Sequence, residues 1–161
     1  MNEWIFWAPV ACAALHMLEE FAWPGGFAAW FRIYRPETAV SFTRTFAVLV
    51  NTTLMVVTLF VGWVGPRWDG GISAFLTLVS VLAFNGLFHV VGALRTHRYS
   101  PGMVTGMLLY IPLCAYSSWY FIRVVKVSPQ LVIVSLAIGS IYQIWSFMTH
   151  RARAVRASAL R

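Results

Sequence analysis

Five apolar runs, each long enough to cross a lipid bilayer, restrict what this chain of 161 residues can fold into. About 20 predominantly apolar residues span the hydrocarbon core as a helix. The runs extend over about residues 4–23, 46–63, 72–94, 103–122 and 130–148. Because no water reaches the bilayer core, each run must satisfy its own backbone polar groups by forming a helix. The predicted fold class is all-α, a polytopic bundle of about five membrane helices in a single integral membrane domain (1–161), with 149–161 as a basic cytoplasmic tail.

The composition supports this class. With 60% hydrophobic and only 11% charged residues, the chain has too few polar side chains to cover the surface of a water-soluble protein. The net charge of +7 could point to nucleic acid, but the basic residues lie in short segments between apolar runs and at the C-terminus. That pattern is a topology signal, so we expect the lipid bilayer as partner and no nucleic acid. Residues 24–43 mix large apolar and basic side chains, which predicts a short interfacial helix after the first span. Pro112 predicts a bend in the fourth.

A histidine and two adjacent carboxylates stand near the end of the first run, at His16, Glu19 and Glu20. The chain has five acidic residues, and these two glutamates are the only ones inside the predicted spans. Ionisable groups at such positions are costly and usually functional. At helical spacing His16 lies one turn from both glutamates, so the three side chains can share one face. This geometry suits metal ligation or proton transfer.

Polar side chains on four helices fall at a similar depth, roughly 5 to 15 Å below one membrane surface at about 1.5 Å per residue. They are His16, Glu20, Asn51, Asn85, His89 and Gln143. A shared level predicts a common cavity. The residues expected to carry catalysis are Glu19, Glu20, His16, His89 and Asn85. Those expected to contact substrate or support the site are Asn51, Arg95, Tyr99 and Gln143.

The candidate ligands predict a cofactor. His16 and His89, with Glu19 or Glu20, would form the two-His-one-carboxylate set of one divalent metal ion, Zn or Fe. Haem bound by His16 or His89 is an alternative. Two carboxylates are too few for a di-iron cluster, which normally takes about four.

The chemistry leaves several functions open. The first is a membrane-embedded enzyme, a hydrolase or an isomerase/cyclase, that applies acid/base or metal-assisted chemistry to a lipophilic small molecule. The second is a proton-coupled carrier or ion-binding protein; five helices lack the paired halves of many transporters, an objection that a homo-oligomer would remove. The third is a haem- or quinone-binding redox subunit.

A purely structural reading competes with all three functions, because the same polar groups could tie the helices together. In that reading Asn51, Tyr142 and Gln143 form hydrogen bonds between helices. His150, beside the basic tail, is expected to be solvated.

The order of motifs resembles one protein family. His16-Met17-Leu18-Glu19-Glu20 is followed by Trp23-Pro24-Gly25, Trp30, Asn85-x-x-x-His89 and Tyr99-Ser100-Pro101-Gly102. This combination is similar to the HXXEE-domain family of small bacterial integral membrane proteins. The matching positions are His16, Glu19, Glu20, Asn85, His89, Tyr99 and Pro101. The resemblance implies a multi-pass bundle with the motif at its centre, and it brings no activity with it.

The distribution of Lys and Arg predicts the topology in a multi-pass cell (inner) membrane. With five spans, one side holds nine basic residues: Arg32, Arg35, Arg44, Arg95, Arg98, Arg151, Arg153, Arg156 and Arg161. The other side holds three: Arg67, Arg123 and Lys126. Basic loops stay in the cytoplasm, so we expect an external N-terminus and a cytoplasmic C-terminus. Reporter fusions at both ends test this; activity of a cytoplasmic reporter at the N-terminus would contradict it.

Overall fold

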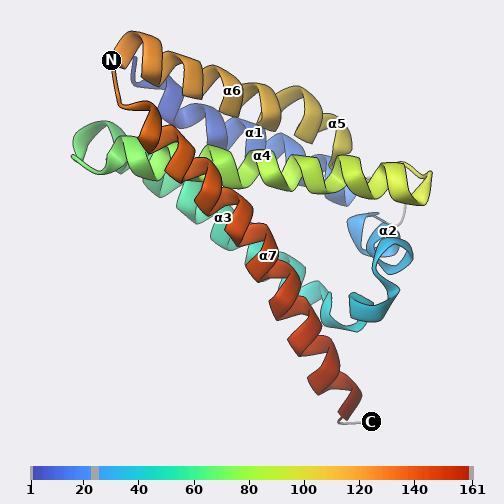
Figure 1. Cartoon of the computed structure of the whole chain (residues 1–161). Coiled ribbons are helices and arrows are strands. Elements are labelled where there is room, and N and C mark those ends of the chain that lie inside the picture. Colours follow the sequence, from blue (N-terminus) through green and yellow to red (C-terminus); the bar gives the residue numbers. More distant parts are fainter. Residues whose placement is uncertain (1, 23–25, 160–161) are drawn as a thin grey trace.

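The computed structural model describes residues 2–22 and 26–159, and within them the chain is helical with no strand (Figure 1). Trp23, Pro24 and Gly25 of the family motif, and Arg161 of the basic tail, lie outside the described residues. Five helices in the described range are long and apolar enough to cross a membrane: Trp4–Ala22, Arg44–Arg67, Gly71–Thr96, Met103–Val125 and Pro129–Ala157. The predicted polytopic helical bundle is confirmed.

The spans are built from regular and irregular helical pieces. In order they are α1 Trp4–Ala22, α2 Gly26–Tyr34, the 3-10 helix η1 Pro36–Ser41, α3 Arg44–Val64, the 3-10 helix η2 Gly65–Arg67, α4 Gly71–Thr96, α5 Met103–Thr105, the π-helix η3 Gly106–Tyr110, α6 Ile111–Tyr120, the π-helix η4 Phe121–Val125 and α7 Pro129–Ala159. The short helix expected after the first span is therefore α2, followed by a further turn of 3-10 helix.

The end of the last helix differs from the prediction. The apolar run indicates an end at Met148, yet α7 continues to Ala159, so the described part of the basic tail is helical. Residues 149–159 contain Ala and Arg, which are good helix formers, and neither Gly nor Pro. Loss of hydrophobicity marks where a helix leaves the bilayer core, and it does not by itself end the helix.

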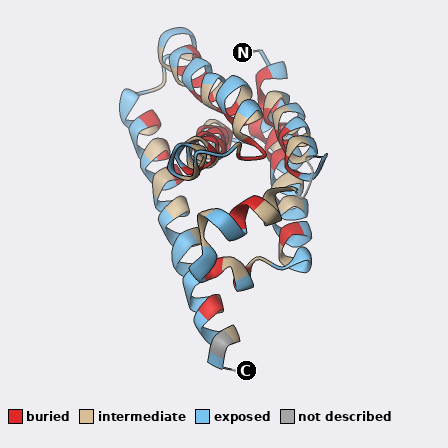
Figure 2. Ribbon diagram, turned by 90° about the vertical axis from the view of Figure 1, so that its right-hand side faces the viewer, coloured by how far each residue is buried: buried red, intermediate tan, exposed pale blue. Residues whose placement is uncertain are grey.

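The helix α4 lies at the centre of the bundle. In Figure 1 α1, α4 and the α5–α6 segment lie alongside one another, while α3 and α7 run obliquely away from them. The helix α3 packs on α1, α7 packs on α4, and the far part of α7 contacts η1. Half of the residues in the most apolar stretch of α4 are buried, against 33% or less in the corresponding stretches of the other four spans. Figure 2 shows the outer faces of α3 and α7 as largely exposed, as expected of surfaces that meet lipid.

The fourth span, in which Pro112 predicts a bend, contains the π-helix η3 directly before that proline. Proline has no N–H, so Pro112 cannot donate a backbone hydrogen bond to the preceding turn. The N–H of Ile111 instead reaches back five residues, to the carbonyl of Gly106. Such π-segments are frequent at functional sites. Here the segment carries Tyr110, whose side chain is fully buried against the first helix.

Glycines set a close contact between α4 and η3 in the bundle core. A Cβ added to Gly86 of α4 would lie 3.0 Å from the Cα of Gly106 in η3, and one added to Gly106 would lie 2.8 Å from the Cα of Gly86. Both neighbours are backbone atoms and cannot swing aside. Small residues at such crossings let membrane helices approach closely.

We therefore expect Gly86→Ala to separate α4 from η3 and to destabilise the protein by about 1–3 kcal/mol, the usual range for overpacking. Thermal unfolding in detergent measures the effect. Gly70→Ala is the matched control, because its Cβ would meet only the end of the exposed Trp68 side chain. Equal stability of the two variants would contradict a tight crossing.

Candidate functional site

Three buried side chains from two helices meet at one point. His16 and Glu20 lie one turn apart on α1, with Nε2 of His16 3.6 Å from Oε1 of Glu20. His89 of α4 places its Nε2 3.3 Å from the same oxygen. One candidate ligand atom from each residue lies within 4.8 Å of the other two. The structure thus brings together three of the residues singled out in the sequence.

Hydroxyl groups orient both imidazole rings. Nδ1 of His16 lies 2.8 Å from Oγ1 of Thr105, and Nδ1 of His89 lies 3.0 Å from Oγ of Ser100. These bonds direct both Nε2 atoms toward Glu20. Both Nε2 atoms are buried, and in the described part of the chain neither forms a well-aligned hydrogen bond, although both lie near Oε1 of Glu20. Buried polar atoms rarely remain unsatisfied without a reason.

The hydrogen bonds of Thr105 determine the tautomer of His16. Its Oγ1 lies 2.5 Å from Oε2 of Glu19, and this short bond to a carboxylate uses the single hydroxyl proton. Thr105 must then accept from His16, so Nδ1 carries the proton. In the neutral ring Nε2 therefore presents a lone pair, as a metal ligand does. Histidines that bind a metal usually donate their other ring N–H to a hydrogen-bond acceptor, which holds the ring in place. In His16 that acceptor is Thr105, which is itself held by the Glu19 carboxylate.

Glu19 has a different environment from its neighbour. Its Oε1 accepts from the hydroxyl of Tyr99 and from the N–H of Val104 at 3.0 Å. Its Oε2 accepts from the N–H of Thr105 at 2.7 Å and from the Thr105 hydroxyl. The carboxylate thus satisfies free N–H groups where α5 begins, which is a favourable place for an anion. Burial and the charge of Glu19 raise the pKa of the Tyr99 phenol, which therefore stays protonated as a donor.

Glu19 was a candidate metal ligand, but the structure holds it outside the group formed by His16, Glu20 and His89. It contacts Thr105, which in turn contacts His16.

Gly102 forms one wall of the site and is required there for two reasons. Its φ of +99° falls in the region that favours glycine. A Cβ at this position would also lie 2.7 Å from Cε1 of both His16 and His89. On another side the ring of Tyr110 packs against His16 with 4.5 Å between centroids, and its buried hydroxyl has no hydrogen-bond partner.

The sequence did not single out four of these contributors, namely Ser100, Gly102, Thr105 and Tyr110, as site residues. Ser100 and Gly102 belong to the Tyr99-Ser100-Pro101-Gly102 segment of the family motif, which gave them no role of their own, and Thr105 and Tyr110 gave no signal at all.

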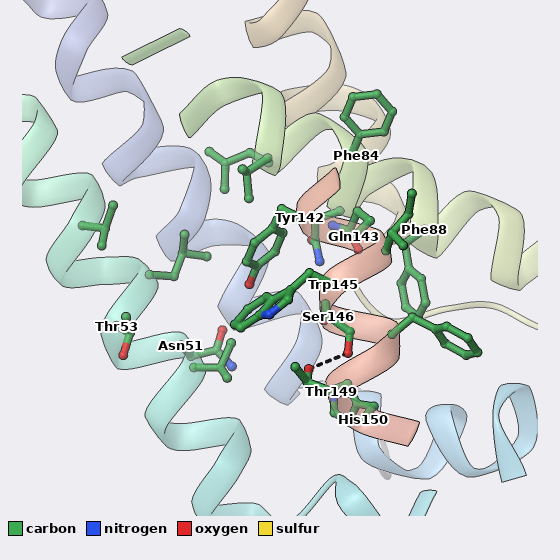
Figure 3. Close-up of a pocket in the computed structure, with 18 of the residues that line it drawn as sticks. Asn51, Thr53, Phe84, Phe88, Tyr142, Gln143, Trp145, Ser146, Thr149 and His150 are labelled. Carbon is green, nitrogen blue, oxygen red and sulfur yellow. Dashed lines mark hydrogen bonds between the residues drawn. The ribbon is translucent and has the colours of Figure 1, made fainter. Parts of the chain in front are cut away.

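A partly open cavity of about 1400 Å³ lies beside the three-residue group and is lined mainly by α2, α3, α4 and α7 (Figure 3). His16 and Glu20 belong to its lining, so the site faces this space. The lining is mostly apolar. The predicted polar residues that also line it are Asn51, Asn85, Arg95 and Gln143. Four helices therefore contribute polar groups to one cavity, as the shared depth predicted, whereas His89, expected at the same cavity, is not among its lining residues.

Two polar residues at this cavity differ from expectation. Asn51 donates through Nδ2 to the carbonyl of Ala47 at 3.0 Å, within its own helix, where a bond between helices was expected. His150 was expected to be solvated, but it is half-buried and its Nδ1 lies 2.6 Å from Oγ of Ser41. The cause is the continuation of α7 past Met148, which packs His150 against the aromatic rings of α2 and α3.

The family described as "Protein of unknown function with HXXEE motif" matches residues 7–117. A relative from Bacillus subtilis (strain 168), "Uncharacterized protein YrkK", is 29% identical over 130 residues, which cover 79% of this chain and 81% of that protein. No solved structure matches the chain significantly. The match spans the first four membrane helices and includes every residue of the three-residue group, and the chain therefore belongs to the HXXEE family.

Proposed function

We propose that this protein is a membrane-embedded, metal-dependent enzyme that acts on a lipophilic small molecule. His16, Glu20 and His89 would hold one divalent ion, Zn or Fe, at the wall of the cavity. The observation that carries the proposal is the convergence of two buried Nε2 atoms on one carboxylate oxygen, with neither atom in a well-formed hydrogen bond among the described residues. A polar knot that merely joined helices would form such bonds, because each buried polar atom left without one costs about 1–3 kcal/mol.

Two of the three ligand spacings fit a small metal ion, and the third is bounded by the 4.8 Å within which all three ligand atoms lie. Ligands at 2.0–2.2 Å around a tetrahedral ion lie roughly 3.3–3.6 Å from each other. Oε1 of Glu20 is 3.6 Å and 3.3 Å from the two imidazole nitrogens. Two nitrogens and one oxygen are the donors that catalytic Zn and non-haem Fe sites use, with positions left open for substrate.

The same geometry disfavours haem held between the two histidines. Their ring centroids are 5.0 Å apart and Gly102 lies against both rings, which leaves no room for a flat macrocycle.

The chain's own residues supply the remaining chemistry. A bound ion of this kind polarises a substrate oxygen or activates a water molecule. Glu19 and Thr105 hold His16 in the ligating tautomer, while Ser100 orients His89. The apolar cavity excludes bulk water and accepts a lipophilic substrate, and Asn85 in its lining offers an amide that can orient a polar group. Hydrolysis, isomerisation and cyclisation all use a polarised oxygen.

The metal site can be tested directly. We expect the purified protein to bind about one Zn²⁺ or Co²⁺ per chain, measured by elemental analysis and by the visible spectrum of the Co²⁺ form. Glu20→Gln, His16→Ala and His89→Ala should each weaken binding by more than the roughly 10–100-fold typical of outer-shell changes. Glu20→Gln should retain the fold, because Gln preserves volume and hydrogen-bonding capacity. Absence of metal binding in the wild type, with equal destabilisation of all three variants, would favour the polar knot instead.

The neighbouring glutamate should respond differently. Glu19→Gln replaces an acceptor of hydrogen bonds with an amide that is partly a donor, so we expect destabilisation of about 2–4 kcal/mol from the loss of charged hydrogen bonds. The variant should still bind one metal ion, with lower affinity. Tyr99→Phe removes a single donor and should cost less, while Tyr116→Phe, at an exposed side chain, serves as its control. Thermal unfolding and metal content are measured together; loss of metal without loss of stability in Glu19→Gln would contradict the assigned division of roles.

A further inference from the structure

The cavity carries basic side chains that the proposed metal site does not use. Arg35, Arg95, Arg153 and His150 all belong to its lining. Among the described lining residues, Glu20 is the only carboxylate, and it is the one that faces the two histidines. The apolar cavity therefore has an excess of positive charge that no acidic side chain of the lining offsets.

Aromatic rings hold two of these guanidinium groups at the cavity wall. Cζ of Arg153 lies 3.9 Å from the ring centroid of Phe46 on α3, and Cζ of Arg35 lies 4.8 Å from that of Phe147 on α7. Stacking on a ring fixes the plane of a guanidinium while its N–H groups stay available. Both arginines are half-buried, so they are positioned within the protein and do not extend freely into water.

Neither guanidinium is neutralised by a close ion pair. Arg35 approaches Glu37 at 3.9 Å, the outer limit of an ion pair, and that glutamate is exposed and does not line the cavity. Arg153 has no carboxylate within 4.0 Å among residues 2–22 and 26–159. Guanidinium groups in such a setting recognise carboxylate and phosphate by paired hydrogen bonds.

The remainder of the lining is suited to a hydrocarbon chain. It continues along α3 and α4 to Trp68 and Gly70, which lie where α3 ends and α4 begins, at the opposite end of both helices from the basic residues. Most of the surface of the lining is apolar. Its volume of about 1400 Å³ exceeds the roughly 300–1,000 Å³ of ordinary small-molecule sites. An amphiphile matches a cavity with an apolar body and a basic end.

We propose that the cavity binds a single-chain anionic amphiphile, whose carboxylate or phosphate head contacts Arg35 and Arg153 while its chain lies between α3 and α7. This names the class of substrate, and its role as substrate rests on the proposed function. Binding itself requires only the cavity and its arginines.

Fluorescent cis-parinarate is a suitable probe, because Trp145 in the lining can transfer excitation energy to it. In zwitterionic nanodiscs we expect saturable binding of parinarate, and binding of its uncharged methyl ester weaker by about tenfold or more, since charge-assisted hydrogen bonds to the head are lost. Arg35→Gln and Arg153→Gln should each weaken parinarate binding by about fivefold or more and leave the ester unaffected. Arg153→Lys should recover part of the loss.

Arg151→Gln is the matched control, since Arg151 is exposed on the same helix and does not line this cavity. Displacement by oleate or by oleyl phosphate identifies the preferred head. The inference is overturned if acid and ester bind equally, if neither competitor displaces the probe, or if Arg151→Gln weakens binding as much as Arg153→Gln in equally stable proteins. His89→Ala, at a residue of the metal site that does not line the cavity, should lose metal and keep parinarate binding. Absence of metal from the wild type, with normal parinarate binding, would overturn the proposed function alone.

Discussion

Two adjacent carboxylates on a membrane helix must each be compensated, and the structure compensates them in different ways. Glu19 receives hydrogen bonds from Tyr99, Val104 and Thr105, all from the segment that joins α4 to α5. This interaction ties the end of α1 to a segment about 85 residues away in the chain. Because an unpaired carboxylate in the bilayer is so unfavourable, the contact fixes the position of that whole turn.

The position of the turn then determines what surrounds Glu20. With Thr105 held by Glu19, the hydroxyl of Thr105 reaches His16, Ser100 reaches His89, and Gly102 fits against both rings. Among residues 2–22 and 26–159, no backbone donor reaches the Glu20 carboxylate, which faces two imidazole nitrogens instead. Glu19 thus ties the helices together, and in the proposed function this leaves Glu20 available as a ligand. A site built only for stability would have no need of this asymmetry.

The sequence was sufficient for the spans and for the identity of the central residues, because both depend on strong, local signals. Apolar runs locate membrane helices, and ionisable residues within them are rare enough to be noticed. The roles of Glu19 and Glu20 could not be separated in this way, since both stand one turn from His16 and only the packing of α5 distinguishes them. Thr105 and Tyr110 are ordinary residues in an apolar run, and the π-helix that carries Tyr110 depends on a proline two positions later. The length of α7 was missed because hydropathy reports the bilayer boundary, whereas helix propensity governs where the helix ends.

The extra length of α7 has consequences for the cavity. Beyond Met148, His150 bonds to Ser41 of η1 and Arg153 stacks on Phe46 of α3, so the extension joins two elements that would otherwise be separate walls. These contacts hold α7 against α3 and η1 at the basic end of the cavity. Further along its length, α7 packs on α4. In the most apolar stretches of α3 and α7, only 22% and 17% of the residues are buried within the protein. Most of the surface of both helices is therefore available to lipid. A hydrocarbon chain passing between them would exchange one apolar environment for another at little cost, and the polar head alone would then determine which amphiphile remains bound.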